Sequence, residues 1–275
     1  MCATPLVKYP RTPHLEGSRL QPGDEDLSQV PFAAIAGRTI VVEEKCDGAN
    51  AAVSFDAQGG LRLQSRGHYL TGGYRERHYG LLKRWATVHQ AALRKALGAR
   101  YVMYGEWLYA KHTVYYNALP HYFLEFDVLD RERNVFLDTS ARRALLGGLP
   151  IVSAPVLARA SFATLPALTS LLGVSGLIQG DPLADLRAYC QGAGEDADLR
   201  CAQTDATRLM EGLYLKAEAN GVVTARMKFV RASYLQGVAA HETGWHQRPV
   251  IPNRLLYPVE ALFETALPPV TGALR

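Results

Sequence analysis

The segment TIVVEEKCDGANAAVSF, residues 39–55, limits the fold of this chain more than any other feature. β-Branched and small apolar residues lie on both sides of a charged centre that contains Gly48. This pattern is typical of a strand, a short loop and a second strand. It therefore predicts that Lys45 stands at the end of a strand.

Further strands are predicted before and after helical segments. A short strand follows a Gly-Gly turn in GGLRLQSRG, and other strands are predicted in ARYVMYGEWLYA, HYFLEFDVLD, EGLYLKAE and GVVTARMKFV. Apolar spacing near 3.6 predicts one helix over residues 77–98, with Gly98 as its stop signal. Residues 1–38, rich in Pro, Gly and Asp, predict an ordered arm rather than a strand. The Leu and Ala runs of residues 138–206 predict one or two helices, to which the sequence assigns no function.

This order of elements favours an α+β fold built on antiparallel sheets. With 275 residues and 48% hydrophobic content, the chain is expected to be globular, with one substantial core or two small ones. The N-terminus has no apolar stretch behind its charges, and no apolar run is long enough to span a membrane, so the cytoplasm is the expected compartment. Four cysteines without CxxC spacing are interpreted as reduced thiols rather than a zinc site or disulfides. They are Cys2, Cys46, Cys190 and Cys201.

Positive charge is distributed unevenly, although the net charge is only +4. Residues 61–100 carry nine Lys or Arg against the single acid Glu76, and residues 226–254 carry five against Glu242. Such stripes suit a polyanionic partner. Each stripe taken alone fits a solvated surface equally well.

The heptapeptide EKCDGAN, residues 44–50, combines residue types that covalent transfer to phosphorus needs. A lysine that attacks phosphorus must be neutral, so neighbouring cations, a metal or burial have to lower its pKa. Gly48 lets the backbone approach a ligand or adopt a positive φ, and Asn50 offers donor and acceptor groups. A charged β-turn centred on Asp47 and Gly48 explains the same residues without a ligand.

EKCDGAN resembles motif I of the covalent nucleotidyltransferase superfamily, which comprises ATP-dependent DNA and RNA ligases and RNA capping enzymes. Other segments resemble the remaining motifs, in the order of that superfamily. SRG at 65–67 is similar to motif Ia, YGEW at 104–107 to motif III, FLEFDVLD at 123–130 to motif IIIa, EGLYLK at 211–216 to motif IV, and ARMKFVR at 225–231 to motif V. The resemblance implies a nucleotidyltransferase fold, an ATP-grasp-like ligase adenylation domain with two antiparallel sheets flanked by helices.

The resemblance also implies a role for each matching residue. Lys45 would become lysyl-AMP, and Phe126 would stack on the base. Taken alone, Phe126 in an apolar strand would be interpreted as core. The other implied ligands of the nucleotide are Glu44, Asp47, Gly48, Asn50, Arg66, Glu106 and Lys216, with Glu44 near the adenine and with Arg66 and Glu106 on the ribose.

Three further residues are implied to act on the metal and the phosphates. Glu211 would be the metal-linked acid, and Arg226 and Lys228 would be catalytic contacts to the α-phosphate. Many members of the superfamily carry lysine at the place of Arg226. A guanidinium holds a phosphate but does not donate its proton, so any acid role falls on Lys228 or Lys216. Without motif I, these residues would be interpreted as surface charges.

Asn50 at the end of motif I and the short hairpin from motif IV to motif V resemble RNA ligases of the phage T4 RNA ligase 2 type. The opening KYPRTPHLEGSR and the tail HETGWHQRPVIPNRL resemble bacterial stand-alone RNA ligases. Only 44 residues follow Arg231, too few for the five-stranded OB barrel of most DNA ligases and capping enzymes. We therefore expect an adenylation domain over residues 1–235 and a short extension over 236–275 packed on it, with no OB domain.

The resulting hypothesis is an ATP-dependent RNA ligase that uses ATP and Mg²⁺ or Mn²⁺. Lys45 takes AMP from ATP and passes it to a 5′-phosphate, and a 3′-hydroxyl then displaces AMP. The expected partners are RNA ends or a nicked RNA duplex, with an end-healing kinase or phosphatase. Two alternatives stay open: a DNA ligase or guanylyltransferase with the same lysine chemistry, and an RNA-binding relative that does not catalyse.

Overall fold

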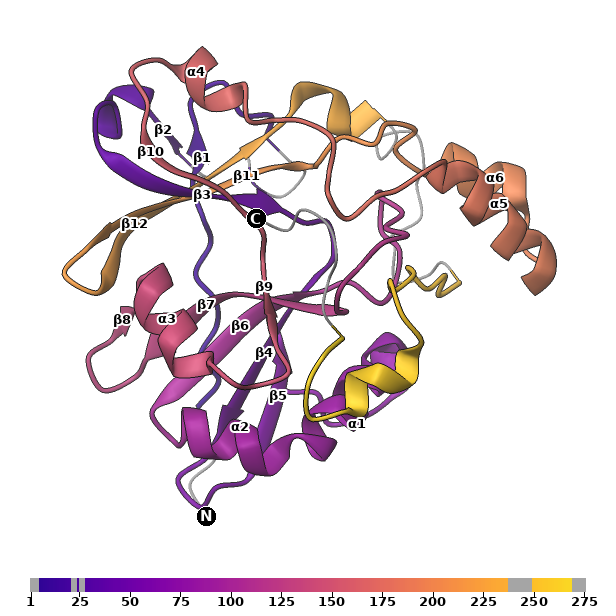
Figure 1. The fold of residues 1–275 in the computed structure, drawn as a ribbon, viewed down its shortest axis with the longest axis horizontal. Coiled ribbons are helices and arrows are strands. Elements are labelled where there is room, and N and C mark those ends of the chain that lie inside the picture. The colour runs from indigo at the N-terminus through magenta and orange to yellow at the C-terminus, as the bar shows by residue number, and fades with distance from the viewer. Residues whose placement is uncertain (1–4, 21–23, 25–27, 237–248, 269–275) are drawn as a thin grey trace.

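The computed structural model describes residues 5–20, 24, 28–236 and 249–268. Two six-stranded sheets, each covered by helices, form the α+β fold that the sequence predicts (Figure 1). The long strands pair antiparallel, whereas three pairs that involve short strands are parallel, namely β1 with β12, β1 with β2, and β9 with β7. The first sheet has the order β10 (Val156–Ser161), β3 (Thr39–Lys45), β11 (Gly212–Ala219), β12 (Val222–Val230), β1 (His14–Leu15) and β2 (Gln29–Val30).

The second sheet lies below the first in Figure 1, with α1 and α2 on its far side. Its order is β5 (Leu61–Ser65), β4 (Ala49–Phe55), β6 (Tyr101–Trp107), β7 (Phe123–Asp130) and β8 (Val135–Phe136), and β9 (Val152–Ser153) pairs with β7. The described helices are α1 (Gly80–Val88), α2 (Gln90–Leu97), α3 (Thr139–Leu146), α4 (Leu165–Thr169), α5 (Pro182–Ala193) and α6 (Ala197–Ala202), with 3₁₀ turns η1 (Phe32–Ala34), η2 (Tyr74–Tyr79), η3 (Ala232–Gln236) and η5 (Val259–Phe263).

β3 and β4 follow each other in the chain but belong to different sheets. The three residues between them, 46–48, therefore carry the chain from one sheet to the other. Gly48 is needed at this crossing, because a Cβ there would lie 2.7 Å from the carbonyl oxygen of Trp107. The strand, loop and strand predicted for residues 39–55 are confirmed, and Lys45 is the last residue of β3.

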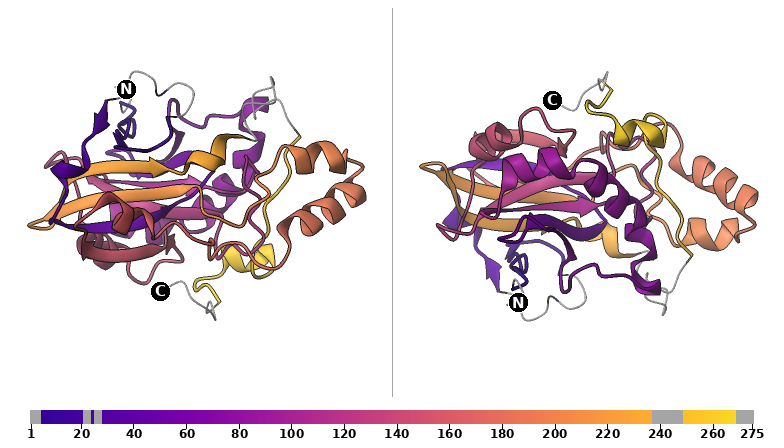
Figure 2. Two further views of the ribbon diagram at one scale, coloured as in Figure 1. Left: turned by 90° about the horizontal axis from the view of Figure 1, so that it is seen from above. Right: turned by 90° about the horizontal axis from the view of Figure 1, so that it is seen from below.

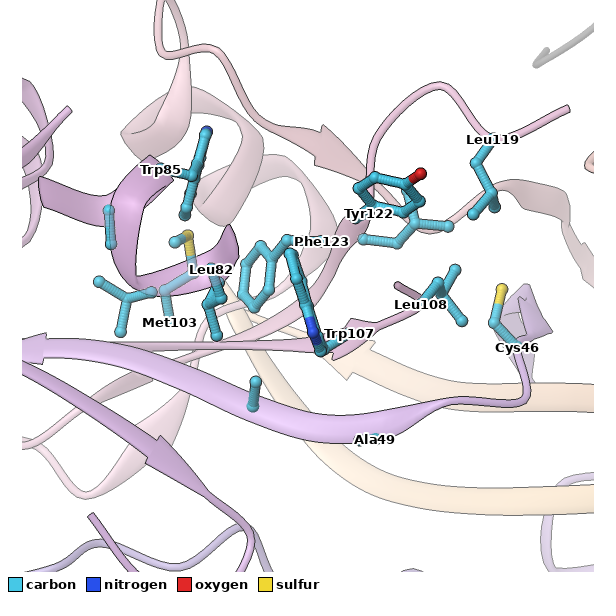
Figure 3. Close-up of a cluster of buried hydrophobic side chains, with 14 of the residues drawn as sticks. Cys46, Ala49, Leu82, Trp85, Met103, Trp107, Leu108, Leu119, Tyr122 and Phe123 are labelled. Carbon is cyan, nitrogen blue, oxygen red and sulfur yellow. The ribbon is translucent and has the colours of Figure 1, made fainter. Parts of the chain in front are cut away.

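Each sheet has its own hydrophobic core. In the core of the second sheet, large side chains of β6, β7 and α1 pack together, and Trp85 stacks on Phe123 with ring centroids 5.7 Å apart (Figure 3). In the core of the first sheet, residues of β3, β11 and β12 pack against α4 and the N-terminal arm. Ile40 and Val42 of β3 belong to it, so strand alternation turns Glu43 toward the second sheet. Polar groups therefore gather between the sheets.

The helix predicted over residues 77–98 is interrupted. α1 and α2 meet at His89, which has φ −93° and ψ 10°. The ring nitrogen Nε2 of His89 lies 2.8 Å from the carbonyl oxygen of Leu262, near the C-terminus. Because this contact is distant in sequence, local spacing does not reveal the break. Gly98 ends α2 as predicted.

Residues 138–206 contain four helices and the strands β9 and β10, so the prediction of one or two helices is wrong. β10 is an edge strand whose side chains show no strict alternation of burial, and this hides it from pattern analysis. α5 begins after Asp181, whose side chain accepts hydrogen bonds from two backbone N–H groups, and it ends at Gly194 in the left-handed conformation. α5 and α6 project together from one end of the molecule (Figure 2).

The described ends of the chain pack on the sheets. The described part of the arm before β3 contains two short strands and the turn η1 and is otherwise irregular, so it is the predicted ordered arm with two short strands that were not expected. Near the C-terminus, Asn253 accepts from Tyr116 N at 2.9 Å and donates to Leu108 O at 2.7 Å. Cys46, Cys190 and Cys201 are free thiols, while Cys2 and Arg248 lie outside the described residues. No described helix has the length and apolarity needed to cross a membrane.

Candidate active site

Residues of both sheets line a cavity of about 630 Å³. The C-terminal end of β3 lines it, together with residues of β4, β6, β7 and β12. Sequence-predicted residues on the wall are Glu44, Lys45, Gly48, Asn50, Arg66, Glu106, Phe126 and Lys228.

Lys45, on the wall of this cavity, forms an ion pair with Glu211, which does not itself line the cavity. Lys45 Nζ donates to Glu211 Oε1 at 2.7 Å, and the lysine side chain is 21% exposed. Glu211 directly precedes β11, whose first residue Gly212 pairs with Lys45 across the sheet. Gly212 has no room for a side chain, because a Cβ would meet the backbone of Phe229. Gly212 thus lets β11 pack closely against β12, and its pairing with Lys45 places the preceding carboxylate of Glu211 beside the lysine.

The surroundings of Lys45 keep it protonated. Burial lowers the pKa of Lys45, but the carboxylates of Glu211, Glu106 and Asp47 outweigh burial and raise it above its ordinary value. In the protein without ligands, burial alone therefore does not supply the lowered pKa that attack on phosphorus needs. Positive charge that engages Glu211 would lower the pKa of the amine and favour its nucleophilic form.

Glu106 and Asn50 stand opposite each other in the β4–β6 pair. Glu106 Oε1 accepts from the Gly48 N–H at 3.2 Å. Burial raises the pKa of Glu106 to about 8, helped by Glu211 and opposed by Lys45. Asn50 Oδ1 is buried, and no described residue donates to it. An unpaired acceptor beside a carboxyl group suits sugar hydroxyls, which donate and accept.

Glu44 is held by a residue that the sequence did not point to. Ser175 Oγ donates to Glu44 Oε1 at 2.5 Å, and the Ser175 N–H donates to Arg208 O at 2.8 Å. Burial raises the pKa of Glu44 to about 7, although the bond from Ser175 opposes this. Such a carboxyl group can donate or accept, so it suits the edge of a purine.

The raised pKa of Glu44 predicts a pH-dependent stabilisation by Glu44→Gln. Its folded-state pKa of about 7 lies above the unfolded-state value, so the folded protein binds more protons in the interval between them. Wild type consequently loses stability as the pH rises through this interval, and glutamine removes the loss. Calorimetry should show the variant more stable by on the order of 2 kcal/mol near pH 8, with no gain near pH 4. Glu132→Gln, at an exposed carboxylate, is the control; an equal gain at both pH values would contradict the assignment.

Asp47 does not line the cavity. Its Oδ2 accepts from the backbone N–H groups of Thr113 and Val114 at 2.7 and 2.8 Å, and its own N–H donates to Tyr116 Oη at 2.8 Å. These bonds fix the crossing between the sheets. The geometry favours a positioning role for Asp47 over the expected contact with nucleotide.

Lys228 lines the cavity from β12, and the N-terminal arm neutralises it. Its Nζ forms an ion pair with Asp24, which also lies 3.1 Å from His14 Nε2 and 3.1 Å from Arg11 Nη2. Burial raises the pKa of Asp24, but these three partners outweigh it and lower the pKa to about 2. A phosphate that binds Lys228 must therefore compete with a permanently charged carboxylate.

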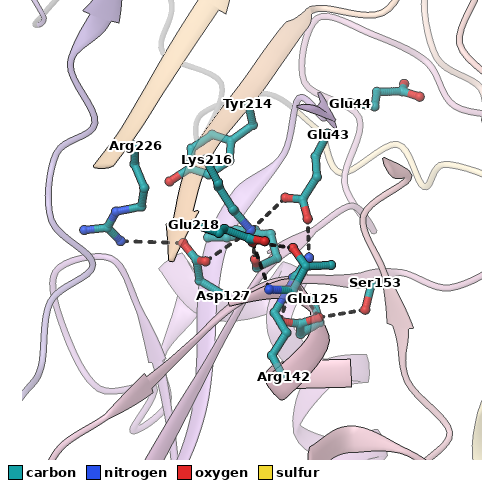
Figure 4. A network of polar contacts seen from close by, with 12 residues as sticks. Glu43, Glu44, Glu125, Asp127, Arg142, Ser153, Tyr214, Lys216, Glu218 and Arg226 are labelled. Carbon is teal, nitrogen blue, oxygen red and sulfur yellow. Dashed lines mark hydrogen bonds and ion pairs between the residues drawn. The ribbon is translucent and has the colours of Figure 1, made fainter. Parts of the chain in front are cut away.

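Lys216 and Arg226 belong to a buried ion network between the sheets (Figure 4). Lys216 Nζ lies 2.8 Å from Glu43 Oε2 and 3.1 Å from Asp127 Oδ1. Arg226 Nη1 lies 3.5 Å from Asp127 Oδ2 and donates to Tyr9 Oη at 3.1 Å. Neither side chain lines the cavity. Their positions favour a role in fixing the strands rather than the predicted contacts with nucleotide and phosphate.

Arg66 and Phe126 present a cation and a ring to the cavity. Arg66 is exposed and makes no hydrogen bond or ion pair with the described residues. Tyr9 of the arm packs edge-on against Phe126, with ring centroids 5.1 Å apart, and donates to Asp127 at 2.5 Å. The arm thus fixes the ring of Phe126 on the cavity wall, a contact that the sequence did not reveal.

The oxygen ligands at Lys45 fit a divalent cation that arrives with a polyphosphate. In the described part of the chain, no three His, Cys, Asp or Glu side chains could hold a metal together. Mg²⁺ is usually bound through one or two carboxylates and the phosphates of a substrate. Glu211, with Glu106 nearby, supplies this kind of partial site.

Comparison with solved structures agrees with the fold. A ligand-free point mutant of Naegleria gruberi RNA ligase is 13% identical with a TM-score of 0.53, and the match covers 86% of this chain and 58% of that one. Another mutant of that ligase, solved with ATP and Mn, is 14% identical with a TM-score of 0.48, covering 86% and 59%. An archaeal ATP-dependent RNA ligase is 16% identical with a TM-score of 0.48, covering 83% and 49%.

This chain therefore spans from about half to three fifths of the length of these structures. A search of curated proteins finds no match. The sequence profile of a family described as RNA ligase matches residues 38–230, which include every motif from Lys45 to Lys228. Because that match covers well over half of the chain, the chain belongs to the RNA ligase family.

Proposed function

We propose that this chain is an ATP-dependent RNA ligase that carries AMP on Lys45. The observation that carries the proposal is the ion pair of Lys45 with Glu211, at 2.7 Å, with Lys45 on the wall of a cavity that both sheets line. Membership of the RNA ligase family supports it. ATP would enter with its adenine toward Glu44 and Phe126 and its ribose toward Glu106.

In the first step, the Lys45 amine attacks the α-phosphorus of ATP. A phosphorus–nitrogen bond forms, the bond to pyrophosphate breaks, and the lysine proton leaves before or during the attack. Mg²⁺ or Mn²⁺ would screen the triphosphate and engage Glu211 when bound. Lys228, which lines the cavity, would contact the α-phosphate once Asp24 has been displaced.

In the later steps, a 5′-phosphate oxygen of RNA takes AMP from Lys45, and a 3′-hydroxyl then attacks that phosphate and releases AMP. The residues of the cavity act by positioning and by stabilising charge on the phosphate oxygens. The proposal treats residues 1–235 as the adenylation domain and 236–275 as an extension packed on it. Cytoplasmic RNA ends or nicked duplexes would be the substrates, with a kinase or phosphatase that heals unsuitable ends.

A sealing assay tests this function. The chain is incubated with ATP, Mg²⁺ or Mn²⁺, and RNA that carries 5′-phosphate and 3′-hydroxyl ends. We expect joined RNA together with the 5′-adenylated intermediate, and no product when ATP is omitted. Matched DNA ends and GTP in place of ATP separate this activity from a DNA ligase and a guanylyltransferase. Salt-dependent RNA binding without adenylation would instead identify a relative that binds but does not catalyse.

A further inference from the structure

A second cavity, of about 440 Å³, lies beside the first, and flat side chains dominate its wall. η2 connects the two, because Tyr74 and Arg77 line the second cavity while His78 and Tyr79 line the first. On the other side, α5 brings a tyrosine from the projecting pair of helices. The wall includes Tyr74, Arg77, Tyr109, Tyr189, Pro249 and Pro252.

The tyrosine rings of this cavity differ in exposure and support. Tyr74 is 78% exposed, an unusual position for an aromatic ring, and Tyr189 is 36% exposed. The guanidinium of Arg77 lies 4.4 Å from the centre of the Tyr74 ring. Tyr109 is held firmly, because it stacks on Trp107 with ring centroids 6.2 Å apart. The molecule thus presents both adjustable and fixed rings.

We propose that this surface, formed by Tyr74, Tyr109 and Tyr189, binds unpaired nucleotides of the RNA strand whose end enters the first cavity. Stacked aromatic rings and an arginine bind single-stranded nucleic acid, since every base offers a π face. No acidic side chain is among the described residues of the wall, which suits a polyanion. In a duplex the bases cover one another, so such rings have no base face to contact.

This inference rests on the proposed function, and it assigns α5 a role in binding RNA through Tyr189. The helix pair would hold the strand a short distance before its end, so that the phosphate reaches Lys45. A protein partner is the main competing occupant. The lack of acidic side chains among the described wall residues, and the position of η2 on the walls of both cavities, favour RNA.

Binding of a fluorescent single-stranded RNA with a 5′-phosphate, followed by anisotropy, tests the proposal. Tyr74→Ala and Tyr189→Ala should each weaken binding about fivefold to a hundredfold, the range for loss of one stacked base. Tyr74→Phe and Tyr189→Phe keep the ring and should bind as wild type does. Leu199→Ala, an exposed position on α6 outside the cavity wall, is the matched control.

Labelling of Lys45 by ATP needs no RNA, so it separates the two proposals. All of these variants should label as wild type does, and their binding of blunt RNA duplex should stay within about twofold. Three results would overturn the stacking surface. The alanine variants could bind single-stranded RNA as wild type does, the phenylalanine variants could lose as much affinity as the alanine variants, or the alanine variants could lose as much affinity for duplex as for single strands. Failure of wild type to label Lys45 would instead overturn the proposed function.

Discussion

Lys45→Ala and Lys45→Arg should both abolish the covalent labelling of the protein by α-labelled ATP. Only the Lys45 amine can form the phosphorus–nitrogen bond, and removal of a covalent nucleophile lowers rates by at least roughly a thousandfold. Arginine keeps the positive charge toward Glu211, but its guanidinium stays protonated and does not attack phosphorus. Gel autoradiography after acid denaturation measures the adduct.

Lys83→Arg is the matched control for this experiment. Lys83 also pairs with a glutamate, at 2.6 Å from Glu76, but it does not line the cavity. Its variant should label like wild type. Retained label in Lys45→Arg would mean that another residue carries AMP, whereas an unfolded Lys45→Arg would be recognised from its unfolding transition.

Arg142→Met should destabilise the protein by about 3 to 5 kcal/mol, the range for breaking a buried ion pair on one side. Arg142 is fully buried, contacts Glu125 at 2.9 and 3.0 Å, and is ion paired with Glu43 (Figure 4). Methionine fills similar space but leaves two buried carboxylates without this cation. Unfolding in urea, followed by circular dichroism, measures the change.

An exposed pair provides the comparison for Arg142. Arg187 lies 2.6 Å from Asp198, and its side chain is 46% exposed. Arg187→Met should change stability by less than about 1 kcal/mol, since water screens such pairs. If both variants lost similar stability, the buried ion pairs of Arg142 would contribute no more to the free energy of unfolding than an exposed pair does. Arg142 links Glu43, which precedes Glu44 on β3, to Glu125 of the second sheet. A large loss only in Arg142→Met would indicate that this link stabilises the contact between the sheets.

Local patterns predicted the parts of the fold that local forces determine. The hairpin of β11 and β12 follows from alternating apolar residues and from the turn at Asn220 and Gly221, which both have positive φ. β10 and the break at His89 depend on partners far along the chain, so the same patterns do not reveal them. Tertiary pairing, rather than weak propensity, accounts for these differences.

The candidate site divides in the same way. Motif positions identified Lys45, Glu106 and Lys228, which do reach one cavity. A motif does not tell which charges face a ligand and which face each other. The motifs assign Lys216 to the nucleotide and Arg226 to the α-phosphate, whereas here both pair with protein carboxylates. The supporting groups Ser175 and Asp24 lie 131 and 204 residues from their partners Glu44 and Lys228, and no sequence spacing connects them.

Peptide mapping of the AMP adduct tests the central proposal most directly. Wild-type protein is incubated with ATP and Mn²⁺ in the absence of RNA, digested, and analysed by mass spectrometry for peptides that carry AMP. We expect one modified site, Lys45, and discharge of the adduct when RNA with a 5′-phosphate is added. An adduct on a different lysine such as Lys228, or no adduct at all, would contradict the assignment of Lys45 as the carrier of AMP.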